Sequence, residues 1–137
     1  MNWNDFDAAL FDLDGVLTPT AELHQHAWSR LFSGLLADYP EQAPYTEDDY
    51  FAHVDGRPRY DGVAAFLSSR GIEVPWGTPA DEPTSLTVCG LGNLKNAEFE
   101  AMLASEGIAP YPGSLRLVEH LAARGIAMAG VSSSQHA

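Results

Sequence analysis

The sequence has little cysteine and lacks any long apolar run. Its one cysteine, Cys89, cannot form a disulfide within the chain. No apolar segment approaches the roughly 18 residues that a membrane-spanning helix requires. The first residues, Met-Asn-Trp-Asn-Asp, lack the positively charged start of a secretory signal peptide. We therefore expect a cytoplasmic protein in a reducing setting, with no membrane association.

Basic residues are also scarce. Seven Lys and Arg residues stand against 19 Asp and Glu residues, which gives a formal net charge of −12 at pH 7. A field of this sign repels the phosphates of nucleic acids and anionic membrane surfaces, so nucleic acid is excluded as a partner. The 137 residues, 45% of them hydrophobic, suffice for one packed domain or for a small domain with an insertion. The composition leaves the oligomeric state open.

Two short apolar runs are typical of buried strands. Residues 8–12 (AALFD) end in a carboxylate and lead to Gly15, and residues 126–131 lead to a run of serines. Parallel sheets are usually covered on both faces and have four or more strands. We therefore predict an α/β fold of which this chain encodes the first two parallel strands, with further strands needed to complete the sheet.

Five segments between these two strands have the sequence signals of helices. The first begins at Thr20, which we predict to be its N-cap, and has a stripe of apolar residues at helical spacing. We also predict helices over residues 47–54, 61–70 and 93–106, and one that Ser114 caps. Residues 74–86 contain three prolines and are predicted to form a long loop.

The motif Asp12-Leu13-Asp14-Gly15 places two carboxylates where the first strand gives way to a loop. In open α/β sheets the reactive site lies beyond the carboxyl ends of the strands. Two carboxylates so close repel each other, and a hard divalent cation such as Mg²⁺ would relieve this repulsion and bind a phosphoryl group. One carboxylate could then attack phosphorus while the other moves a proton. Gly15 permits a tight turn that presents backbone N–H groups to an anion.

Each of these signals also has a purely structural explanation. Aspartate is common in turns at strand ends, so Asp12 and Asp14 could serve the turn alone. Ser132 and Ser133, at the end of the second strand, could offer hydroxyl and amide donors to a phosphate. A serine in such a place is more often a helix cap. A choice between the two explanations needs the other motifs of the chain.

The motifs FDLDGVLTPT, TAELHQHAW, VDGRPRYDGV, LGNLKNAEF, YPG and VSSSQ occur in this order along the chain. This ordered set resembles the haloacid dehalogenase superfamily and, within it, the β-phosphoglucomutase-like branch. The resemblance spans almost the whole chain and implies a Rossmann-like core with an α-helical cap inserted after the first strand. Residues 1–19 and 107–137 would form part of the core domain, and residues 20–106 would form the cap domain.

The resemblance implies Mg²⁺-dependent phosphoryl transfer on a small sugar phosphate. Asp12 would be the nucleophile that forms an aspartyl-phosphate, and its carboxylate would also bind Mg²⁺. Asp14 would be the general acid and base, with its backbone carbonyl on the metal. Ser132 would hold the phosphate, and Ser133 would contribute its amide.

The resemblance also assigns substrate-binding residues to the region of the cap. Thr20 and His24 match positions near the hinge and the substrate, and Trp28 matches an aromatic residue that lines the site. Arg59 matches an arginine that binds the distal phosphate of the substrate, a role that suits a bidentate guanidinium. Lys95 matches a cap lysine that reaches the same site. The alternative for both cations is an ordinary solvated surface.

The sequence departs from the family pattern in two respects. Pro19 stands where this branch often has aspartate. The basic residue of the family's third motif and the acidic metal ligands of its fourth are absent up to Ala137, so the chain looks C-terminally truncated. Three alternatives stay open: a mutase that converts glucose 1-phosphate to glucose 6-phosphate, a sugar-phosphate phosphatase in which water reaches the aspartyl-phosphate, and a catalytically incomplete fragment.

Overall fold

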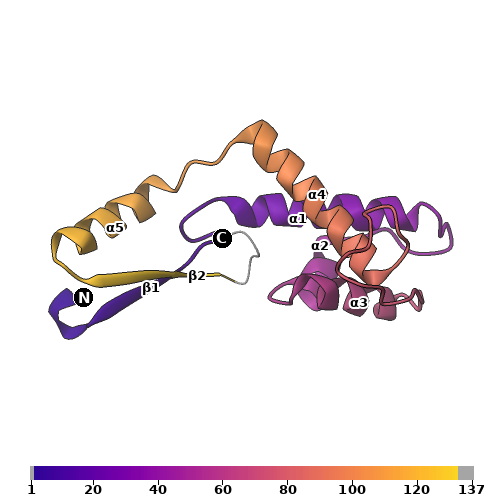
Figure 1. Cartoon of the computed structure of the whole chain (residues 1–137), viewed down its shortest axis with the longest axis horizontal. Coiled ribbons are helices and arrows are strands. Elements are labelled where there is room, and N and C mark those ends of the chain that lie inside the picture. The colour runs from indigo at the N-terminus through magenta and orange to yellow at the C-terminus, as the bar shows by residue number, and fades with distance from the viewer. Residues whose placement is uncertain (1, 133–137) are drawn as a thin grey trace. The chain divides into compact units, whose positions relative to one another are not determined.

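The computed structural model describes residues 2–132 of the chain and divides it into two compact units. The first unit consists of Met1–Glu22 and Gly107–Ala137, and the second of Leu23–Glu106. Figure 1 shows the strands of the first unit and the helices of the second. Over the described residues, no helix is both long enough and apolar enough to cross a membrane.

The first unit contains a parallel pair of strands. Strand β1 (Ala8–Asp12) pairs with β2 (Ala127–Val131), and the register runs from Ala8 opposite Ala127 to Asp12 opposite Val131. The short helix η1 (Trp3–Asp5) precedes β1, and helix α5 (Pro112–Ala123) precedes β2. The structure therefore confirms the predicted α/β fold class and both predicted strands, with β2 starting at Ala127 rather than at residue 126.

The start of α5 corrects one prediction. Ser114 does not cap this helix, because the N-cap is Tyr111 and Pro112 takes the first helical position. Proline suits that position, since its missing N–H would have no partner in the helix anyway. The Ser114 hydroxyl instead donates a hydrogen bond of 2.6 Å to the carbonyl oxygen of Val16, which ties α5 to the loop after β1.

The second unit packs its helices around an aromatic and aliphatic core. Helix α1 (Thr20–Leu36) contributes most of its residues to this unit, together with α2 (Glu47–Asp49), η2 (Tyr50–Val54) and α3 (Arg59–Ser69). The rings of Phe32 and Phe66 lie 3.9 Å apart between centroids and are fully buried. The predicted helix over residues 47–54 is present, and its second half, η2, is a π-helix. The buried cluster consists of Trp28, Leu31, Phe32, Leu35, Leu36, Val54, Val63, Phe66, Leu67, Ile72, Val88 and Leu91.

Helix α4 (Val88–Glu106) begins earlier than the predicted residue 93. Its first residues include Gly90 and Gly92, and glycine lowers helix propensity, so the sequence pattern missed the start of the helix. The packing requires both glycines. A Cβ on Gly90 would lie 2.3 Å from the Ser85 carbonyl oxygen, and one on Gly92 would lie 2.6 Å from the Tyr60 ring. The Thr87 hydroxyl accepts a hydrogen bond of 2.9 Å from the Gly90 N–H and so caps the helix.

Candidate active site

Asp12 is the last residue of β1, and its side chain is exposed. Its Oδ1 accepts a hydrogen bond of 2.8 Å from the Leu13 N–H. The Leu13 carbonyl oxygen in turn accepts from the backbone N–H groups of Leu17 and Thr18, each at 3.0 Å. These bonds close the loop after the strand and fix the direction in which the carboxylate leaves it.

Gly15 makes this loop possible. It has φ +77°, a conformation that side chains disfavour, and its N–H donates to the Thr18 carbonyl oxygen at 2.7 Å. The predicted tight turn is therefore present, and the N–H of Gly15 itself holds the turn closed. The contact of this loop with a phosphate stays a prediction.

Asp14 has a defined hydrogen-bond donor. The buried Thr20 hydroxyl donates to Asp14 Oδ1 through a short hydrogen bond and lies 2.9 Å from the Thr18 hydroxyl. Thr20 is the first residue of α1 rather than the N-cap that the sequence predicted. Whatever its contact with a substrate, Thr20 is placed to orient the Asp14 carboxylate.

Ser132 lies at the same edge of the sheet as Asp12. The strands are parallel, and Asp12 pairs with Val131, so the residues that follow each strand leave the sheet side by side. Ser132 is partly buried. The pairing of β1 and β2 thus brings together two predicted site residues that are far apart in the sequence. Ser133 lies outside the described residues.

The chemistry of the strand edge fits magnesium. Carboxylate and carbonyl oxygens are the ligands that this ion prefers, and it is usually bound through one or two carboxylates with waters and substrate phosphate completing the shell. Asp12 and Asp14 can supply the carboxylate and carbonyl oxygens. Within the described residues, no group of three or more His, Cys, Asp or Glu side chains is arranged to hold a metal. The described residues could thus supply only part of a magnesium shell.

A second group of predicted residues lies in the helical unit around Lys95. This lysine is only 4% exposed, so it does not belong to a solvated surface. Its ammonium nitrogen lies 2.6 Å from His24 Nδ1, and because an ammonium group can only donate, Nδ1 is the acceptor. The same ammonium lies 5.2 Å from the Trp28 ring centroid and 5.0 Å from that of Phe99. His24, Trp28 and Lys95, three predicted substrate residues, therefore form one cluster.

Phe99 also belongs to this cluster. In the sequence it was only one of the apolar residues of the predicted helix over residues 93–106. Its ring stacks on His24 at 4.0 Å between centroids, with the planes 4° apart. The available signal was its position four residues after Lys95, which places both side chains on one face of a helix. Phe99 and Trp28 give the buried ammonium two aromatic partners.

Arg59 is the first residue of α3 and lies in the same unit. Its guanidinium carbon is 5.1 Å from the Tyr60 ring centroid, and its Nη2 lies 3.4 Å from the Tyr60 hydroxyl. Tyr60 in turn donates to Asn93 Oδ1 at 2.9 Å. Sequence reasoning left Tyr60 and Asn93 without a role, because nothing in the sequence shows that α3 and α4 meet at these residues.

A model of the haloacid dehalogenase-like hydrolase family matches residues 6–137 of the chain. The chain belongs to this family. Among curated proteins, β-phosphoglucomutase from Mycobacterium tuberculosis (strain CDC 1551 / Oshkosh) is 47% identical over 133 residues, which cover 93% of this chain and 51% of the relative. The chain thus spans about half the length of this curated relative.

Solved structures of the family share this fold. A variant of CbbY from Rhodobacter sphaeroides in complex with xylulose-(1,5)bisphosphate matches with a TM-score of 0.61 and 26% identity, over 94% of this chain and 52% of that one. A family IA hydrolase from Entamoeba histolytica HM-1:IMSS matches with a TM-score of 0.66 and 22% identity, over 96% of this chain and 51% of that one. The haloacid dehalogenase fold implied by the sequence motifs is therefore confirmed.

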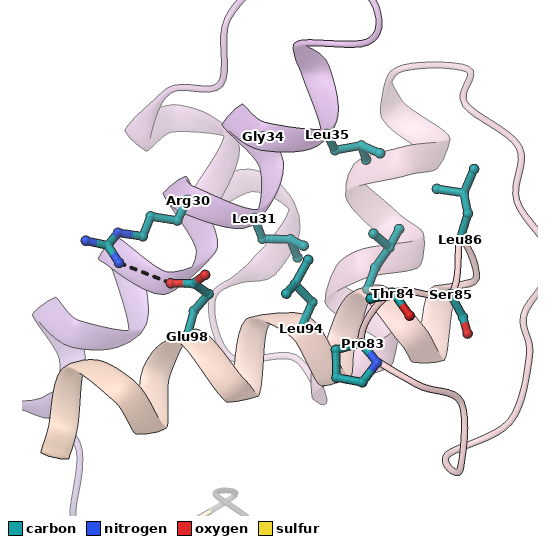
Figure 2. Close-up of a pocket in the computed structure, with 11 residues that line it drawn as sticks. Arg30, Leu31, Gly34, Leu35, Pro83, Thr84, Ser85, Leu86, Leu94 and Glu98 are labelled. Atoms are coloured by element: carbon teal, nitrogen blue, oxygen red, sulfur yellow. Dashed lines mark hydrogen bonds and ion pairs between the residues drawn. The ribbon is translucent and has the colours of Figure 1, made fainter.

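The helical unit also has a groove of about 510 Å³ that none of the predicted site residues lines. Figure 2 shows its walls, formed by α1, α4 and the loop over residues 83–86. Leu31, Leu35 and Leu91 make it largely apolar, and an ion pair of 3.1 Å between Arg30 and Glu98 lies at its edge.

Proposed function

We propose that this chain takes part in Mg²⁺-dependent phosphoryl transfer on a sugar phosphate, through an aspartyl-phosphate on Asp12. The reaction best supported is the conversion of β-glucose 1-phosphate to glucose 6-phosphate. The observation that carries the proposal is the placement of Asp12 and Ser132 at one edge of a parallel sheet, in a chain that is 47% identical to a β-phosphoglucomutase. Phosphoryl transfer needs a nucleophile and a phosphate-binding group close together at this edge of the sheet.

We assign the two units to two roles. Residues 1–19 and 107–137 form part of the catalytic core domain, and residues 20–106 form the helical cap domain. The core supplies the nucleophile and the cap supplies contacts to the substrate. The compact units support this assignment, since one contains Asp12, Asp14 and Ser132 and the other contains His24, Arg59 and Lys95.

The first step is attack by a carboxylate oxygen of Asp12 on phosphorus. An oxygen–phosphorus bond forms on Asp12, the bond between phosphorus and the departing oxygen breaks, and Asp14 gives that oxygen a proton. Ser132 donates a hydrogen bond to the phosphoryl oxygens, and Ser133 contributes its amide as a second donor. When bound to the Asp12 carboxylate and the Asp14 carbonyl oxygen, Mg²⁺ would neutralise part of the phosphoryl charge.

The second step returns the phosphoryl group to a sugar hydroxyl. The hydroxyl oxygen attacks phosphorus, its proton passes to the Asp14 carboxylate, and the bond between Asp12 and phosphorus breaks. Alternation of the two steps moves phosphate between the C1 and C6 positions through a bisphosphate. The Thr20 hydroxyl, which donates to Asp14, keeps this carboxylate in one orientation during both proton transfers.

The cap residues hold the part of the substrate that does not react. Arg59 binds the distal phosphate with two parallel hydrogen bonds. Lys95, His24 and Trp28 face the sugar as one cluster, in which the ammonium is already desolvated before the substrate arrives. A desolvated cation interacts more strongly with an anionic substrate than an exposed one does.

A sugar-phosphate phosphatase is the second candidate, favoured by the match to a hydrolase family model. The same aspartyl-phosphate would then be attacked by water instead of a sugar hydroxyl. Which of the two occurs depends on how completely the closed site excludes water.

The two candidates differ in product. The chain is incubated with Mg²⁺, β-glucose 1-phosphate and a trace of β-glucose 1,6-bisphosphate, and the products are resolved by ³¹P NMR. Glucose 6-phosphate as main product supports the mutase, and inorganic phosphate supports the phosphatase. Transfer of phosphate to the protein is followed in parallel by mass spectrometry and by its release with hydroxylamine, a reagent for acyl phosphates.

Asp12→Asn is the decisive variant. It keeps the size of the side chain and removes the nucleophilic carboxylate, so we expect protein phosphorylation and turnover to fall at least about a thousandfold. Asp7→Asn, a change of the exposed aspartate before β1, is the matched control and should have no effect. Phosphorylation that survives Asp12→Asn would show that the nucleophile is another residue.

A further inference from the structure

Asn93 joins three segments of the helical unit. Its Oδ1 accepts the hydrogen bond from the Tyr60 hydroxyl at 2.9 Å. Its Nδ2 donates to the carbonyl oxygens of Pro79 and Asp81 at 3.1 and 2.8 Å. The amide is therefore engaged on both sides, which links α3, α4 and the proline-rich loop over residues 74–87.

Arg59 and Tyr60 pack together over Gly92. A Cβ at that glycine would lie 2.6 Å from the Tyr60 ring and 3.4 Å from Arg59 Cγ, so the space that Gly92 leaves open is the space that these two side chains use. The Arg59 guanidinium lies against the Tyr60 ring and beside its hydroxyl. The Tyr60 side chain thus packs along one side of Arg59.

The loop that Asn93 holds is itself ordered by Asp81. The Asp81 carboxylate accepts from the Thr78 N–H at 3.2 Å, the Thr78 hydroxyl at 2.9 Å and the Thr87 hydroxyl at 2.7 Å. These hydrogen bonds hold the pKa of Asp81 below its usual value. Asn93 therefore connects Tyr60 to a structured loop rather than to a free one.

We propose that Tyr60 and Asn93 are positioning residues for Arg59, and that through them the loop over residues 74–87 sets the affinity for the distal phosphate. An arginine side chain has many rotamers, and a phosphate that binds a freely moving guanidinium must restrict them. The Tyr60 ring, which Asn93 holds, already restricts the rotamers of Arg59. Phosphate binding therefore loses less side-chain entropy. Because Arg59 meets the distal phosphate only under the proposed function, this inference rests on that function.

The test is the affinity for a phosphate monoester, read at Arg59 itself. The ¹⁵N-labelled chain is titrated with glucose 6-phosphate, and the Arg59 Nε–H signal is followed by NMR, with glucose as the probe that lacks phosphate. Tyr60→Phe removes only the hydroxyl, and Asn93→Ala removes its partner. We expect each variant to shift the Arg59 signal in the free protein and to weaken phosphate-ester binding about fivefold, the worth of one hydrogen bond.

Three further variants make the outcome decisive. Asn96→Ala is the matched control, since this asparagine lies one turn further along α4 and its exposed side-chain amide donates to Glu100 at 2.7 Å. It should bind as the unchanged chain does. The double variant Tyr60→Phe/Asn93→Ala should bind no more weakly than Tyr60→Phe alone, because the Tyr60 hydroxyl is the group through which Asn93 reaches Arg59. Urea unfolding checks that each variant is folded.

Arg59→Ala separates this inference from the function on which it rests. If Arg59→Ala loses binding while Tyr60→Phe and Asn93→Ala bind like the unchanged chain, the positioning role is wrong and the phosphate contact of Arg59 stands. If Arg59→Ala binds like the unchanged chain, or if that chain does not bind the ester, the phosphate contact of Arg59 is wrong and the positioning role fails with it. Loss in all three, with Asn96→Ala unaffected, supports the inference.

Discussion

At the scale of single residues, the sequence marked the reactive groups more clearly than their partners. Asp12 and Asp14 stood out because two carboxylates so close at a strand end repel each other unless a cation lies beside them, and the ordered motifs favoured this explanation over a plain turn. Thr20 was predicted as a helix cap and a substrate neighbour, and the structure shows its hydroxyl on Asp14. Phe99, Tyr60 and Asn93 were missed, because an aromatic or amide side chain carries no signal until its neighbour in space is known.

The Thr20 contact leads to a prediction about catalysis. Thr20→Val keeps the shape of this buried side chain and removes the donor to Asp14. We expect kcat to fall about tenfold with KM unchanged, since an unrestrained carboxylate is a poorer acid and base while the substrate contacts remain.

The measurement is steady-state turnover of β-glucose 1-phosphate. Thr84→Val, at an exposed threonine in the helical unit, is the control and should leave both constants unchanged. A rise in KM with kcat intact would place Thr20 in substrate binding and count against its role on Asp14.

At the scale of elements, the sequence patterns located both described strands and the longer helices, but they missed the short helix η1 and several boundaries. Helix α4 starts at Val88, and its Gly90 and Gly92 permit close contacts with Ser85 and Tyr60. A pattern of apolar residues cannot show such contacts. Helix α5 starts at Pro112 because proline is well suited to a first helical position, and Ser114 then serves the loop after β1. Tertiary packing decided both boundaries.

Two helix glycines should respond to alanine in opposite directions. Gly92→Ala places a Cβ 2.6 Å from the Tyr60 ring, and we expect it to lower the free energy of unfolding by about 1–3 kcal/mol. At Gly34, within α1, an added Cβ meets no atom within 4 Å. Gly34→Ala should therefore raise the free energy of unfolding by about 0.5–1 kcal/mol through helix propensity. Urea denaturation measures both, and equal effects would contradict the close packing at Gly92.

The contact of α2 with the end of α3 should depend on pH. The Asp49 carboxylate accepts from the Thr46 N–H at 2.9 Å and from Arg70 Nη2 at 2.8 Å. Partial burial alone would raise the pKa of Asp49, but the hydrogen bond from the Thr46 backbone and the charge of Arg70 outweigh it and hold this pKa below its usual value. A carboxyl group whose pKa is lower in the folded state stabilises the fold above its unfolded pKa of about 4 and stops doing so as pH falls.

Asp49→Ala tests this sign. We expect it to lower the free energy of unfolding by about 1–2 kcal/mol at pH 7, and by progressively less as the pH falls from about 5 towards 2, because the unchanged chain loses the same contribution there. Thermal and urea unfolding across this pH range provide the measurement. Asp48→Ala, at the exposed neighbour, is the control. A difference between the Asp49→Ala and unchanged chains that stays constant with pH would rule out the ionised pair.

At the scale of the whole molecule, the two-stranded sheet leaves apolar side chains uncovered. Leu10, in the middle of β1, is 72% exposed, and Val131 at the end of β2 is 55% exposed. The described residues also contain no group of three or more metal-ligating side chains. The mycobacterial relative is about twice as long as this chain.

We expect a fusion of this chain to the C-terminal half of the mycobacterial relative to turn over β-glucose 1-phosphate at least about a hundredfold faster than the chain alone. Additional strands would cover Leu10, and additional ligands would tighten Mg²⁺ binding at Asp12. Turnover of both proteins is compared at saturating Mg²⁺, with Asp12→Asn in the fusion as the control. Equal rates would show that residues 1–137 already contain the complete active site.

The sequence by itself determined the fold class, the two strands, the approximate positions of the longer helices and the carboxylate motif, because each of these depends on spacing along the chain. Tertiary structure decided which residues meet: Asp12 with Ser132 through strand register, Asp14 with Thr20, Lys95 with His24 and Trp28, and Tyr60 with Asn93. Such pairs join positions that are distant in the sequence or turned towards each other by a loop. Their distances follow from how helices and strands pack, and no local pattern of residue types records that packing.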